Sequence, residues 1–89
     1  MARFEMAGAE MAWMSEMQPS SDSLFELGMI YSSGRDEGTD LVAAHKWFNL
    51  AAMRGNQEAA YHRQEVAREL APQALAAALR AAREWLSTH

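Results

Sequence analysis

The side chains best suited to acid–base or metal chemistry in this sequence are three histidines: His45, His62 and His89. None has a second histidine or an acidic partner at a convincing metal-ligand spacing. Glu58 lies four residues before His62, but pairs at this spacing on a helix are usually surface neighbours worth about 0.2–0.5 kcal/mol. The histidines therefore predict no catalytic residue and no metal site. A small enzyme built on histidine and glutamate is the least favoured function.

Other reactive or ligand-binding patterns are also explained by structure. The serines at positions 20, 21 and 23 suit the capping of a helix better than a nucleophile. Trp47 and Phe48 could form an aromatic ligand box, but the alanines around them indicate a packed core. The loop from Gly34 to Thr39 has neither the alternating oxygen ligands of a calcium loop nor a phosphate cradle. We expect no cofactor.

The elements that would position these side chains begin with the stretch from Leu24 to Ala59, which reads as two amphipathic helices. In the first, the apolar stripe has the spacing i, i+3, i+4 and i+7: Leu24, Leu27, Gly28 and Tyr31. Ser23 and Glu26 offer a capping box for its start. Because glycine inside a helix costs roughly 1 kcal/mol relative to alanine, its place on the stripe predicts close approach by another helix.

The second helix is expected to start at Asp40, whose carboxylate suits an N-cap. Its apolar stripe is Ala44, Trp47, Phe48, Ala51 and Ala52. We expect Trp47 to be buried against Leu27 and Tyr31. Gly55 is expected to end this helix in a left-handed conformation, where a side chain is penalised.

These residues carry a resemblance to a known family. The order Leu-Gly-x-x-Tyr-x-x-Gly, Asp, Ala-x-x-Trp-aromatic, Ala-Ala-x-x-Gly and Glu-Ala resembles the Sel-one-like repeat, a relative of the tetratricopeptide repeat. The matching positions are Leu27, Gly28, Tyr31, Gly34, Asp40, Ala44, Trp47, Phe48, Ala51, Ala52, Gly55, Glu58 and Ala59. Asp36, Glu37 and Ala43 depart from the pattern. The resemblance covers somewhat under half of the chain and implies a pair of antiparallel helices.

The remainder of the chain is predicted to contain a second, degenerate unit. At an offset of 36 residues, Arg63-Gln64 replaces the Leu-Gly pair, which is typical of a terminal repeat with a polar face. Pro72 suits the first position of a last helix, and Ala82-x-x-Trp85-Leu86 repeats the arrangement of Ala44-x-x-Trp47-Phe48. An alanine three residues before an aromatic residue is also common by coincidence.

The predicted fold class is all-α: a short α-solenoid of antiparallel helix pairs with four to five helices. Residues 1–20 are expected to form an N-terminal helix or a flexible leader. Residues 21–89 form the repeat domain, with residues 21–55 as the main repeat and residues 56–89 as the degenerate capping repeat. The leader is rich in methionine, which suits packing against the repeat or adaptable binding.

Composition narrows the function classes. The chain has 89 residues, no cysteine and a net charge of −4, so one small domain without disulfides is expected. The acidic balance and the lack of a basic stripe argue against nucleic acid as a partner. No apolar run approaches the roughly 20 residues of a membrane span. We expect a cytoplasmic protein that binds neither nucleic acid nor membrane.

The resemblance implies a non-enzymatic adaptor that binds a peptide or helix of another protein. In tetratricopeptide-like stacks, first-helix residues that point away from the helix pair line the binding groove. By this resemblance the partner-binding residues here are Phe25, Met29, Ser32, Tyr61, Glu65 and Arg68. The alternative is a self-associating structural protein, a homodimer or larger oligomer formed through the stack ends or the methionine-rich leader.

Overall fold

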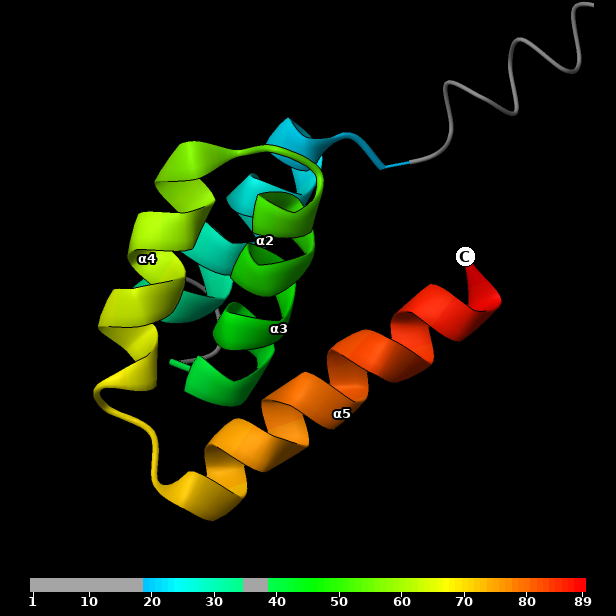
Figure 1. The fold of residues 1–89 in the computed structure, drawn as a ribbon. Helices are drawn as coiled ribbons and strands as arrows, with labels where there is room; N and C mark the ends of the chain where they lie inside the picture. The colour runs from blue at the N-terminus through cyan, green and yellow to red at the C-terminus, as the bar shows by residue number, and fades with distance from the viewer. Residues whose placement is uncertain (1–18, 35–38) are drawn as a thin grey trace, which may run out of the picture.

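The computed structural model describes residues 19–34 and 39–89, and every regular element in these residues is a helix (Figure 1). The elements are α2 (Ser21–Ser33), α3 (Leu41–Met53), α4 (Gln57–Ala67) and α5 (Pro72–Thr88). The predicted all-α class is confirmed for this part of the chain. The expectations for residues 1–18 and for the loop at 35–38 lie outside the described residues.

Helix α2 begins three residues earlier than the predicted capping box requires. Its N-cap is Ser20, whose Oγ accepts a hydrogen bond from the backbone N–H of Ser23 at 3.1 Å. Ser23 is therefore the third residue of the first turn, and the capping box of Ser23 with Glu26 is wrong. The cause is local. Ser20 and Ser23 can both act as an N-cap, and the helix extends back to Ser20. Gly34 ends α2 with a left-handed φ of 66°.

The other helix ends agree better with the ends predicted from the sequence. The Oδ1 atom of Asp40 accepts from the backbone N–H of Ala43 at 3.0 Å, so the predicted N-cap of α3 is confirmed. Gly55 follows α3 with a φ of 100°, a value that favours glycine. Asn56 caps α4, and Pro72 occupies the first turn of α5.

Helices α2 and α3 approach each other closely at Gly28. A Cβ atom placed there would lie 2.5 Å from two ring carbons of Phe48, so only glycine leaves room for the ring. Phe48 is fully buried, as is Leu24 one turn before Gly28. The predicted close packing at this glycine is confirmed.

Helix α3 is the centre of the core, because α2, α4 and α5 all pack against it (Figure 1). Four of its residues belong to the main buried cluster, and one residue or two come from each of the other helices. The full cluster is Leu24, Ala44, Phe48, Leu50, Ala51, Ala59, Val66 and Ala82.

Trp47 does not lie where the sequence predicted. It is partly buried, and its ring meets Trp85 of α5 edge-on at 6.0 Å between centroids. Tyr31, its expected neighbour, is 37% exposed. The predicted full burial of Trp47 is wrong, because Phe48 takes the position opposite α2 and adjacent residues on a helix point about 100° apart. Trp47 therefore turns toward α5.

Helix α5 packs mainly against α3, whereas the sequence predicted that it would pair with α4. Figure 1 shows it leaving the lower end of α4 and running beside α3 toward the C-terminus. Ala78 and Ala82 are the buried residues of α5, and Arg54 lies 5.4 Å from the ring centroid of Trp85. What the described residues form is a four-helix domain around α3.

None of the described helices combines the length and apolar character needed to cross a membrane.

We expect Gly28→Ala to destabilise the protein. The clash with Phe48 should cost up to about 3 kcal/mol, and the better helix propensity of alanine returns about 1 kcal/mol, which leaves a net loss of about 1–2 kcal/mol. Urea unfolding followed by circular dichroism measures this. In a Phe48→Leu background the same change should be neutral or stabilising. An equal loss in both backgrounds would contradict the close contact.

We also expect Trp85→Ala to lower the stability of the fold more than the substitution Leu86→Ala at the next residue does. Trp85 contacts Trp47 and Arg54, whereas Leu86 is 40% exposed. Large-to-small changes cost most where the side chain is packed. Thermal unfolding of the two variants tests the comparison. Equal losses would mean that the Trp85 contact does not hold α5 to α3.

Candidate binding site

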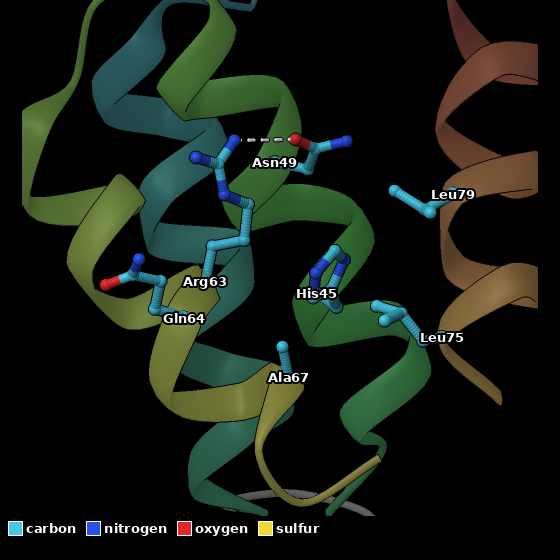
Figure 2. A pocket seen from close by; sticks show the side chains of 7 residues that line it. All are labelled: His45, Asn49, Arg63, Gln64, Ala67, Leu75 and Leu79. Atoms are coloured by element: carbon cyan, nitrogen blue, oxygen red, sulfur yellow. Dashed lines mark hydrogen bonds between the residues drawn. The ribbon is translucent and has the colours of Figure 1, made fainter. Parts of the chain in front are cut away.

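An open cleft of about 260 Å³ lies where α3, α4 and α5 meet. Figure 2 shows its lining side chains: His45 and Asn49 on α3, Arg63, Gln64 and Ala67 on α4, and Leu75 and Leu79 on α5. Its volume falls just below the roughly 300–1,000 Å³ of most small-molecule sites. The cleft can therefore take a small molecule or the end of a larger one.

The cleft follows from the helix arrangement. On α3, His45 and Asn49 are four residues apart and so share a face. On α5, Leu75 and Leu79 have the same spacing. Because α5 packs against α3 and diverges from α4, the side chains of α4 and α5 do not close over this face of α3.

One hydrogen bond fixes the polar side of the cleft. The Nη1 atom of Arg63 donates to Oδ1 of Asn49 at 2.9 Å. Because a guanidinium can only donate, Asn49 must turn its oxygen toward α4. Its amide nitrogen consequently lies on the side facing α5, as Figure 2 shows. Both residues are partly buried, which holds them in place.

His45 lines the same cleft and is only 3% exposed. Its Nδ1 atom is buried and has no hydrogen-bond partner among the described residues. Burial lowers the pKa of His45 below its ordinary value of 6.5, and the nearby positive charge of Arg63 lowers it further. The imidazole is therefore neutral at pH 7, and its buried polar nitrogen lacks the bond that such groups normally make.

His62, in contrast, is used in packing. Its ring stacks on Phe48 at 5.2 Å with an interplanar angle of 21°. The ring centroid of Phe25 lies 5.5 Å from that of His62 and 5.7 Å from that of Phe48. These three rings join α2, α3 and α4, so His62 is explained without any chemistry.

The six residues predicted to bind a partner lie outside the cleft. On α2, Phe25 and Met29 are partly buried against the core, and the Oγ of Ser32 donates to the carbonyl of Met29 at 3.2 Å. Neither apolar residue is therefore an open surface.

On α4, the other three predicted residues share an outward face. Tyr61 is 61% exposed, and Glu65 and Arg68 form a surface ion pair at 3.5 Å. By helix geometry this face lies roughly opposite Arg63 and Ala67. The two sets of residues thus define separate surfaces, and a role of the predicted set in binding stays a prediction.

No three histidine, aspartate or glutamate side chains come together as a metal-ion cage within residues 19–34 and 39–89. The seven described residues that line the cleft combine hydrogen-bond donors with aliphatic carbon, and none of the seven has a carboxylate or hydroxyl side chain. Such a lining can bind and orient a ligand. It offers no nucleophile with a base beside it.

Sequence reasoning did not find this cleft. The available signal was a histidine and an asparagine four residues apart, beside the apolar stripe of α3. That signal is weak, because the third wall depends on where α5 packs.

Comparison of the chain with protein-family models, with curated proteins and with solved structures gave no match.

We expect folding stability to fall as the pH is lowered, and His45 to cause part of the fall. Because its pKa is lower in the folded chain, the unfolded chain binds a proton first below about pH 6.5, and that favours unfolding. Urea unfolding at about pH 7.5 and 5.5 measures the loss. In His45→Leu the loss should be smaller. This variant should be at least as stable as the parent at the higher pH, because no unbonded nitrogen is left buried. Identical pH profiles would rule His45 out as a cause.

Proposed function

We propose that this chain is a non-enzymatic interaction module, a helical adaptor that binds a segment of another protein. The Sel-one-like spacing of residues 24–59 supports this assignment, and so does the close α2–α3 pair that the spacing predicted. On this proposal residues 21–55 are the main repeat and residues 56–89 are a degenerate terminal repeat, whose last helix packs against α3 in place of α4.

The observation that carries the proposal is the open cleft between α3, α4 and α5. Its apolar wall and fixed donors have the composition of a binding pocket, in which a few placed polar groups orient a mainly apolar ligand. The buried, unbonded nitrogen of His45 is a stability cost of about 1–3 kcal/mol. A binding role gives this costly residue a purpose that packing does not.

Self-association is the second candidate, and a separate observation supports it. Leu79 and Leu86 on α5 are each 40% exposed, and Met53 at the end of α3 is 58% exposed. Seven positions separate Leu79 and Leu86, so they share one helix face. A second copy could cover that face.

Site-specific photocrosslinking in cells of the source organism tests these alternatives. A benzophenone amino acid replaces Leu79 at the cleft, Tyr61 on the outward face of α4, or Glu84 on the opposite side of α5 as a matched exposed control. We expect a covalent adduct with a different protein from position 79 and none from position 84.

The other outcomes are equally informative. Adducts only between copies of this chain would establish self-association in place of the adaptor function. An adduct from position 61 alone would return the binding surface to the residues predicted from sequence. If neither position 79 nor position 61 gives an adduct with a protein, the adaptor function is contradicted.

A further inference from the structure

The cleft has more hydrogen-bond donors than the protein itself uses. A guanidinium carries five N–H donors, and Arg63 spends one at Asn49. The amide nitrogen of Asn49 supplies two more on the side facing α5 (Figure 2). None of the seven lining residues is acidic. The polar side of the cleft therefore carries the positive charge of Arg63, and none of its lining residues supplies a carboxylate to balance that charge.

The opposite side is aliphatic. Leu75 is partly buried and Leu79 is 40% exposed. Figure 2 shows Leu79 across from the amide of Asn49 and Leu75 beside His45. A ligand that satisfies both sides must carry an anionic acceptor at one end and a short hydrocarbon chain at the other.

The amount of positive charge in the cleft narrows the choice of anion. Among the described residues that line the cleft, Arg63 is the only arginine or lysine. A single guanidinium suits the planar, singly charged carboxylate, which it binds through two parallel N–H bonds. A phosphate would bring more negative charge than this one cation matches.

We propose that the cleft binds an aliphatic carboxylate, with the carboxylate on Arg63 and the Asn49 amide nitrogen and the hydrocarbon against Leu75 and Leu79. This rests on the proposed adaptor function and names its ligand: the carboxyl terminus of a partner protein that ends in an aliphatic residue. A free branched-chain acid has the same chemistry and is the other source.

Titration of the full chain with defined probes tests the proposal. The probes are a short peptide ending in a free leucine carboxylate, the same peptide amidated at that end, and 4-methylpentanoate. The side-chain signals of Arg63 and Asn49 in nitrogen-15 NMR report the site, and calorimetry gives the affinity. We expect the free peptide to shift both signals, and amidation to weaken binding about tenfold or more, because a charge-assisted pair is lost.

Two variants separate the cleft from general charge effects. Arg63→Met keeps the aliphatic stem and should weaken binding of the free peptide about tenfold or more. Arg80→Met removes an exposed arginine that does not line the cleft and should leave binding unchanged. Circular dichroism and thermal unfolding of each variant confirm that it folds. If Arg63→Met does not fold, Asn49→Leu is the second variant, with the same expected weakening.

The outcomes separate this inference from the proposed function. Equal binding of the free and amidated peptides, or equal losses in the two arginine variants, would overturn the carboxylate site. Binding of 4-methylpentanoate without the peptide would keep the carboxylate site and contradict the partner terminus. No binding of any probe at millimolar concentration would overturn the inference, while a protein adduct from position 79 would still support the adaptor function.

Discussion

The arrangement of this domain depends on the contact between the ring of Phe48 and the bare backbone of Gly28. The ring is fully buried and occupies the space that a Cβ atom would need. This brings α2 against α3 and fixes the rotation of α3 about its axis. Once Phe48 faces α2, the 100° step per residue sends Trp47 to one side and Asn49 to the other. The contact between Trp47 and Trp85 and the position of the cleft therefore both follow from the packing of Phe48 on Gly28.

Helix α3 is covered on more than the face that packs against α2. Leu50, which points about 160° away from Phe48, is only 1% exposed. Such a helix needs neighbours on opposite sides, and α5 supplies the second one. A chain with few large apolar residues per helix gains from this arrangement, because one central helix serves as the packing partner of three others. The consequence is that α5 is drawn away from α4, and the cleft remains open between them.

The cleft shows how a small core can accommodate a polar site. His45 stands next to the buried stripe of α3 and is itself buried, although its Nδ1 finds no partner in the described part of the chain. Burial and Arg63 keep the imidazole neutral at pH 7, so the charge of the cleft comes from Arg63. The bond to Asn49 holds that guanidinium in one orientation. Fixed donors of this kind lose little entropy when a ligand binds, which favours affinity.

The sequence by itself determined the helices, most of their ends and the contact at Gly28. Those features depend on neighbours within a few residues: a cap such as Asp40, a stop such as Gly55, or a glycine on an apolar stripe. The start of α2 was misplaced only because serines at 20 and 23 can both cap. Tertiary structure decided the partner of Trp47, the place of α5 and therefore the cleft. These depend on which helix offers the larger surface to bury, and an apolar stripe such as that of α5 specifies that it must be covered without specifying by which neighbour.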